Sequence, residues 1–138
     1  MSDSPALVYE NTIHETLGVR TLEIDPDRVV IEMDVGPVVH QPMGLLHGGA
    51  SAVLAESAAS MGAFVSVDTE KQFAVGIDLN ISHLRAMRSG TLRATATPIR
   101  KGRAVQVWGI DLQDEAGKMI AVARCTLAVR SWADLKEQ

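Results

Sequence analysis

Hydrophobic and polar residues alternate with a period of two along much of the chain, which is typical of β-strands with one buried face. The alternation is clear at residues 28–35, after a turn expected at Asp25-Pro26-Asp27. It returns in the second half of the chain. We therefore predict five strands, at residues 28–35, 72–84, 91–97, 103–113 and 118–130.

Two details of this pattern bear on the arrangement of the strands. Alternation within 72–84 places Asp78, Asn80 and Ser82 on one face of the strand. The five apolar residues of the opposite face are Phe73, Val75, Ile77, Leu79 and Ile81. The last two strands flank residues 114–117, whose sequence Asp-Glu-Ala-Gly is typical of a hairpin turn.

The segment 48–66 differs from the rest because it is small and apolar on nearly every side. A helix that is hydrophobic all round is buried. A shorter helical stretch is expected between Thr12, which has the capping-box spacing to Glu15, and Gly18. Together these elements predict a single α+β domain over residues 1–138. Its antiparallel sheet of five to six strands is wrapped around one long central helix.

Length and composition agree with one globular domain, since the chain has 138 residues, 46% of them hydrophobic and 22% charged. Glu56 interrupts the apolar segment, and the first residues lack the basic and apolar regions of a secretory signal. We therefore expect no membrane association and no export. The single cysteine, Cys125, excludes an internal disulfide and favours a cytoplasmic location.

The net charge of −4 conceals an uneven distribution of acids and bases. Residues 1–78 hold 12 acids and three bases, whereas residues 79–110 hold no acid and six bases. A basic interval in an acidic protein indicates a local anion site; the alternative is a set of solvated strand faces that lack acids. We expect no nucleic-acid partner, because Trp108 is the only aromatic residue near this interval.

Glu56 is the only charged residue between His47 and Asp68. Burying a carboxylate costs free energy unless it is paired or hydrogen-bonded, so such a group is a candidate general base or nucleophile. The alternative is a structural carboxylate that emerges at a subunit contact or a sheet edge.

The residues before the long helix offer hydrogen-bond donors. Gly48 and Gly49 leave backbone N–H groups sterically open at the positive end of the helix dipole, where an anion or a developing oxyanion is stabilised. Gln41 adds a neutral amide, and His47 adds a ring nitrogen beside the glycines. Tight packing of the turn would also account for the two glycines.

Other chemistries find less support in the sequence. Ser51 lacks the closing glycine of a nucleophile elbow, and no phosphate-binding glycine loop is present. His40, His47 and Glu56 have no recognised metal-ligand spacing, so we expect no metal site.

The helix geometry also predicts how the protein assembles. Gly48 and Glu56 are separated by about 12 Å of axial rise and roughly 80° of rotation, so Glu56 does not act comfortably on a group held at its own Gly48. A second helix running antiparallel beside the first brings its Glu56 to this Gly48, and a two-fold dimer does so twice. Ser60 lies one turn after Glu56 on the same face and is placed to orient the carboxylate or a water molecule.

Residues 41–51, with the sequence QPMGLLHGGAS, and Leu54-Ala55-Glu56-Ser57 resemble the hotdog-fold acyl-CoA thioesterases. Within that family they are similar to the branch that hydrolyses hydroxybenzoyl-CoA and dihydroxynaphthoyl-CoA. The similarity continues through residues 80–85 and 106–108, with the sequences NISHLR and QVW, and covers most of the chain.

This resemblance implies a hotdog dimer that pairs again into a tetramer. It implies that the Gly48 N–H and Gln41 hold the thioester carbonyl, that His47 positions this region, and that Glu56 of the opposite subunit is nucleophile or general base, assisted by Ser60. The CoA phosphates would meet basic residues, namely His83, Arg85, Arg100, Lys101 and Arg103. CoA is then part of the substrate, and no separate cofactor is implied.

Three functions remain open at this point. The first is hydrolysis of an aromatic or medium-size acyl-CoA to free acid and CoA. The second is hydration or dehydration of an enoyl thioester on the same fold. The third is a non-catalytic acyl-CoA-binding module, although such a pocket gains little from a buried carboxylate. Periodicity does not distinguish a flat aryl pocket from a tunnel for a linear chain.

Overall fold

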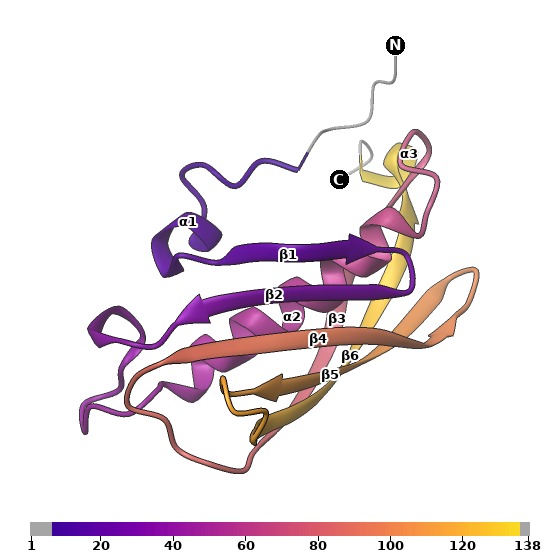
Figure 1. Cartoon of the computed structure of the whole chain (residues 1–138). Helices are drawn as coiled ribbons and strands as arrows, with labels where there is room; N and C mark the ends of the chain where they lie inside the picture. Colours follow the sequence, from indigo (N-terminus) through magenta and orange to yellow (C-terminus); the bar gives the residue numbers. More distant parts are fainter. Residues whose placement is uncertain (1–6, 136–138) are drawn as a thin grey trace.

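The computed structural model describes residues 7–135 as one six-stranded antiparallel sheet and a long helix packed against one of its faces (Figure 1). The strands are β1 (Arg20–Asp25), β2 (Arg28–Asp34), β3 (Gln72–His83), β4 (Thr91–Lys101), β5 (Val105–Gln113) and β6 (Met119–Ser131). The helices are α1 (Ile13–Leu17), α2 (Gly48–Val65) and α3 (Trp132–Leu135), with a 3₁₀ turn at Pro37–Val39.

The strands lie side by side in the order β1-β2-β4-β5-β6-β3, so β1 and β3 form the two edges of the sheet. The hairpin at residues 114–117 joins β5 to β6 as predicted, with the Asp114 N–H donating to the Lys118 carbonyl at 3.0 Å. β3 follows α2 in the chain and pairs with β6 along almost its whole length. In the sequence α2 lies between the first two strands and the last four. In the fold it packs against one face of the sheet and contacts all six strands.

Helix α2 is the centre of the core because its small residues let the sheet approach closely. Leu54, Ala55, Ala58 and Ala59 are fully buried. Gly62 faces the ring of the buried Trp108, and a Cβ at this glycine would lie 2.4 Å from the ring. The packing thus depends on the absence of a side chain at one helical position.

The expected sheet of five to six antiparallel strands around one long central helix is confirmed. Strand β1 was not predicted. Its six residues are all exposed, and Leu22 and Ile24 are 50% and 42% accessible, so the strand has no buried face; the brief alternation of these two residues with Glu23 and Asp25 was not counted as a strand. β4 also continues past Pro98 to Lys101, with a register shift between Pro98 and Arg100.

Two face assignments made from the sequence are wrong. A bulge between Gly76 and Asp78 changes which side of β3 faces the helix. Ala74, Leu79 and Ile81 pack against the core, while Val75 and Ile77 are 43% and 58% exposed. In addition, α2 is not buried on every side, because Glu56 and its neighbours on that face are only half-buried. The open side of α2 and the edge strand β3 are next to each other, which positions the site described below.

Candidate active site

The loop before α2 presents one free backbone N–H at the start of the helix. His47 is the N-cap residue, and its Nδ1 accepts the Gly49 N–H at 2.7 Å. The imidazole therefore accepts the hydrogen bond of one of the two glycine N–H groups that the sequence analysis expected to be free. Among residues 7–135 no acceptor receives the Gly48 N–H, so this group remains available at the positive end of the helix dipole.

Gln41 is held so that its amide nitrogen is free. The turn from residue 41 to residue 45 is closed by the Gln41 N–H donating to the Leu45 carbonyl at 2.7 Å, with Gly44 at φ +77°. The Gln41 side-chain oxygen accepts the Met43 N–H. Its oxygen is engaged inside the turn, and no acceptor within residues 7–135 receives its NH₂ group, which is therefore available as a donor.

Gln41 and Gly48 line one cavity of about 390 Å³ together with His83 and Arg85. His83 ends β3, and its ring lies directly beside Gly48, where a Cβ would be 2.9 Å from the imidazole Nε2. Two backbone donors also fix the loop, since the Leu46 N–H donates to the Met87 carbonyl at 2.7 Å and the His47 N–H donates to the Val39 carbonyl at 2.8 Å. The structure thus brings the predicted donors Gly48 and Gln41 together with two predicted CoA contacts.

Glu56 and Ser60 line a different cavity of about 620 Å³, which lies between the open side of α2, strand β3 and the N-terminal segment. The Glu56 carboxylate rests against the backbone of β3, because a Cβ at Gly76 would lie only 2.2 Å from Glu56 Oε1. Most of the surrounding side chains are apolar. Those on α2 and β3 are Val53, Met61, Phe64, Ala74 and Val75.

These two cavities share no lining residue. In a single protomer the carboxylate of Glu56 therefore does not reach the space beside Gly48 and Gln41. The separation agrees with the helix arithmetic, which places the two positions about 12 Å apart along α2.

The basic residues expected at the CoA phosphates divide into two groups. His83 and Arg85 lie beside Gly48. Arg100, Lys101 and Arg103 lie at the β4–β5 turn, at the opposite end of the sheet from the loop that precedes β4 (Figure 1). Lys101 forms an ion pair with Asp27 at 2.8 Å, and its ammonium lies 5.7 Å from the centre of the Trp108 ring. One protomer thus does not gather all five residues at one site.

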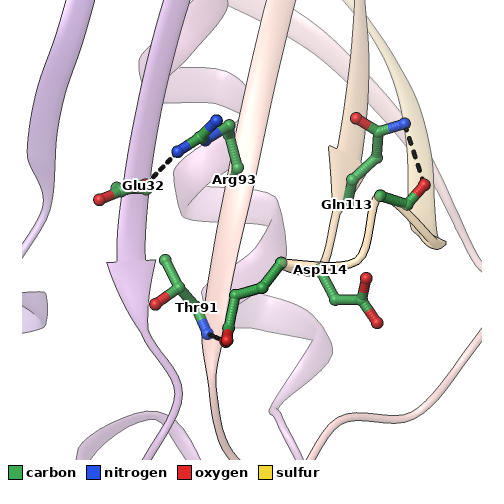
Figure 2. Close-up of a pocket in the computed structure, with 7 residues that line it drawn as sticks. Glu32, Thr91, Arg93, Gln113 and Asp114 are labelled. Atoms are coloured by element: carbon green, nitrogen blue, oxygen red, sulfur yellow. Dashed lines mark hydrogen bonds and ion pairs between the residues drawn. The ribbon is translucent and has the colours of Figure 1, made fainter.

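A polar hollow of about 360 Å³ on the sheet is lined by side chains that form ion pairs or accept backbone hydrogen bonds (Figure 2). Arg93 pairs with Glu32 at 3.1 Å, and Glu32 also binds Arg20. The Glu115 carboxylate accepts the Thr91 N–H. The Arg93–Glu32–Arg20 pairs and the Glu115 contact hold neighbouring segments together, and the Asp114 carboxylate accepts the Ala116 and Lys118 N–H groups of its own turn, so we do not include the hollow in the site.

The sequence analysis missed two residues of the Glu56 cavity. Gly76 gives the carboxylate its place at the bulge of β3, and an isolated glycine inside a strand pattern is a signal for such a close approach. His14 reaches the cavity from α1, and its Nε2 lies 3.0 Å from the Ser57 hydroxyl oxygen. No local pattern in the sequence marks this second contact, because the two residues are 43 positions apart.

Cys125 takes no part in either cavity. Burial and the nearby negative charges of Glu56 and Asp78 raise the pKa of its thiol to about 12, so it stays protonated and unreactive at neutral pH. Within residues 7–135 no group of three or more His, Cys, Asp or Glu residues is arranged to hold a metal ion. None of the helices in this part of the chain is long and apolar enough to cross a membrane.

Comparison with known proteins gives a consistent result. Residues 43–121 match the model of the thioesterase superfamily. The chain is 45% identical to a putative esterase of Pseudomonas aeruginosa, over 87% of this chain and 83% of that protein. It is 40% identical to the 1,4-dihydroxy-2-naphthoyl-CoA hydrolase of Listeria monocytogenes, over 86% of this chain and 95% of that protein. A crystal structure of a thioesterase from Haemophilus influenzae superposes with a TM-score of 0.84 at 36% identity, covering 95% and 96% of the two chains.

Proposed function

The chain belongs to the thioesterase superfamily and is a thioester hydrolase of the hotdog fold, and we propose that it cleaves an acyl-CoA to a free acid and CoA. The observation that carries this proposal is the free Gly48 N–H in the same cavity as Gln41, whose NH₂ group has no acceptor among the described residues. Two neutral donors at a helix N-terminus suit a carbonyl oxygen that becomes negative during the reaction.

We further propose that the active unit is a dimer in which each site combines residues of both protomers. This is supported by the separation of the Gly48 cavity from the Glu56 cavity within one protomer. It is also supported by β3, a 12-residue edge strand whose Val75 and Ile77 are exposed. A long edge strand with apolar side chains pairs readily with another chain. Pairing of two β3 strands about a two-fold axis leaves α2 of each protomer beside α2 of the other.

In this proposed site the thioester oxygen accepts hydrogen bonds from the Gly48 N–H and the Gln41 amide. Glu56 of the partner subunit then follows one of two routes. Its carboxylate attacks the carbonyl carbon, releases CoA thiolate and forms an anhydride that water hydrolyses, or it removes a proton from a water molecule that attacks directly. Either route breaks the carbon–sulfur bond, consumes one water molecule, and yields the free acid and CoA, whose thiolate takes up a proton from that water. Ser60 orients the carboxylate or the water, and His47 fixes the loop through its bond to the Gly49 N–H.

The two ends of the substrate find suitable surroundings on either side of this centre. His83 and Arg85 lie beside Gly48, where they would meet the phosphates of CoA, and the β4–β5 turn of another protomer would add Arg100, Lys101 and Arg103. The apolar cavity of about 620 Å³ at Glu56 suits an aromatic or medium-size acyl group. The relative from Listeria monocytogenes carries the name of a naphthoyl-CoA hydrolase, which supports an aromatic acyl group. Pairing of dimers into a tetramer and a cytoplasmic location belong to the same proposal.

Release of CoA thiol from benzoyl-CoA and hexanoyl-CoA tests the proposal. We expect Glu56→Gln to lower kcat by about 10²-fold or more, because the isosteric amide neither attacks nor accepts a proton. Glu70→Gln, at an exposed acid in the turn before β3, is the matched control and should retain wild-type activity. Unchanged thiol release by Glu56→Gln, or none by the wild type, would contradict the proposal. Loss of enoyl absorbance without thiol release would instead favour hydration of an enoyl thioester.

A further inference from the structure

One polar contact interrupts the apolar lining of the Glu56 cavity. His14, on α1, places its Nε2 3.0 Å from the Ser57 hydroxyl oxygen, on α2. Both residues line the cavity and both are half-buried. The Tyr9 ring stacks on the imidazole with a centroid distance of 5.2 Å and so limits the orientations of the ring. The N-terminal segment therefore holds a fixed imidazole against the wall of the cavity.

The contact is set apart from the reacting centre by the geometry of α2. Ser57 follows Glu56 directly, so its side chain leaves the helix about 100° further round. Glu56 points to the backbone of β3 at Gly76, whereas Ser57 points to α1. The cavity thus has the carboxylate at one wall and the His14–Ser57 pair at another, with apolar side chains between them. An acyl group that enters beside Glu56 extends toward the pair.

The His14–Ser57 pair retains hydrogen-bonding capacity after its own contact is made. Partial burial lowers the pKa of His14, so the ring is neutral at pH 7 and keeps one nitrogen as an acceptor. The Ser57 hydroxyl has one donor and two acceptor positions, of which the contact uses one. The pair can therefore both donate to and accept from an oxygen of a ligand. A wholly apolar acyl group would bury these polar atoms without a partner, which costs free energy.

We propose that His14, paired with Ser57, is a specificity-determining residue that selects acyl groups with a hydroxyl or carbonyl oxygen at the end far from the thioester. The inference rests on the proposed function, because it assigns the acyl end of the substrate to the Glu56 cavity. Selection acts through the free energy lost when an apolar acyl group buries the polar atoms of His14 and Ser57 without a hydrogen-bond partner. Sites that hydrogen-bond a substrate hydroxyl discriminate strongly against analogues that lack it.

Two matched substrate pairs test the inference: 4-hydroxybenzoyl-CoA with benzoyl-CoA, and 6-hydroxyhexanoyl-CoA with hexanoyl-CoA. For at least one pair we expect wild-type kcat/KM to favour the hydroxylated member by about 10-fold, the value of one hydrogen bond to a partly buried group. In His14→Leu the ratio should fall to near one, with activity on the apolar member retained. His14→Gln, which keeps a donor and an acceptor, should restore part of the ratio. A general structural role would instead lower kcat for both members equally.

Ser57→Ala gives a second measurement that leaves α1 intact and should reduce the same ratio. Thr16→Val is the matched control, because Thr16 lies on α1 but does not line the cavity. Two results would overturn this inference and leave the proposed function intact, provided that hydrolysis still depends on Glu56. One is that the wild type prefers neither hydroxylated substrate. The other is that the kcat/KM ratio is unchanged in both His14→Leu and Ser57→Ala. Absence of hydrolysis by the wild type on all four substrates would overturn both.

Discussion

Gly76 and Glu56 show how a single missing side chain can position a carboxylate, here the one that we propose to be catalytic. The carboxylate of Glu56 occupies the space where a Cβ of residue 76 would stand, 2.2 Å from Oε1. The site therefore depends on a strand residue that carries no functional group. Gly76 leaves room for the carboxylate at the bulge of β3, where the regular pairing with β6 is interrupted.

We predict that Gly76→Ala lowers kcat by about 10- to 100-fold, because the new methyl group displaces the carboxylate and small errors in the position of a reacting group cost that much. The sheet should remain folded, since residue 76 is on an edge strand. Thiol-release kinetics and thermal melting together measure the two effects. Gly36→Ala is the matched control, because a Cβ there meets no atom within 4 Å. Wild-type kcat in Gly76→Ala would show that the carboxylate is not held in this place during catalysis.

The sequence identified the candidate residues by their chemical type but did not predict which residues they contact. Glu56 was visible because it is the only charge in a long apolar segment, and Gln41 and Gly48 because they precede a helix. The contact of His14 with Ser57 was not visible, because it joins two elements distant in sequence. The hydrogen bond from the Gly49 N–H to His47 could not be predicted from the sequence either, since either ring nitrogen of a histidine can donate or accept.

Among the elements, α2 is the one whose packing is set most tightly by its small residues. Gly62 lies in the last turn of α2, and glycine within a helix normally destabilises by about 1 kcal/mol relative to alanine. Three atoms of the Trp108 ring would lie within 3 Å of a Cβ at this position. Close contact between the helix and β5 therefore outweighs helix propensity at residue 62.

We predict that Gly62→Ala destabilises the protein, although alanine is the better helix former. The rigid and fully buried Trp108 ring cannot move aside without disturbing β5, and overpacking of this kind costs about 1–3 kcal/mol. The expected result is a fall of a few degrees in the melting temperature. Thermal unfolding followed by circular dichroism measures it. A higher melting temperature would mean that propensity decides at this position and that the ring adapts.

Strand prediction succeeded where one face of the element is buried and failed where none is. β5 has buried residues on alternate positions, and β2 and β6 keep one at every second position over most of their length, so their hydrophobic pattern was sufficient. β1 is exposed throughout, and the brief alternation of Leu22 and Ile24 with Glu23 and Asp25 was not recognised as a strand. The bulge in β3 inverted the predicted face of part of that strand, because a one-residue shift exchanges the two sides.

In the molecule as a whole, the proposed catalytic groups lie about two turns apart along one helix and in separate cavities. Gln41 and Gly48 gather near the start of α2, whereas Glu56 faces the exposed edge strand β3 two turns further along. The single protomer, with its exposed edge strand beside the only carboxylate of α2, does not bring these proposed groups together. The proposed dimer, inferred from helix geometry in the sequence, would do so.

Mixing two inactive variants tests this shared site. Gln41→Ala removes a donor from one cavity and Glu56→Ala removes the carboxylate from the other, so each homodimer should be inactive at both sites. A heterodimer of the two has one site with Gln41 and Glu56 both present, from different chains, and one site lacking both. Refolding the variants together at equal concentrations should therefore restore about a quarter of wild-type thiol release, since about half of the dimers are mixed. Refolding each variant alone is the control. If Glu56 served the Gly48 of its own chain, no mixed dimer would contain an intact site, and activity would not return.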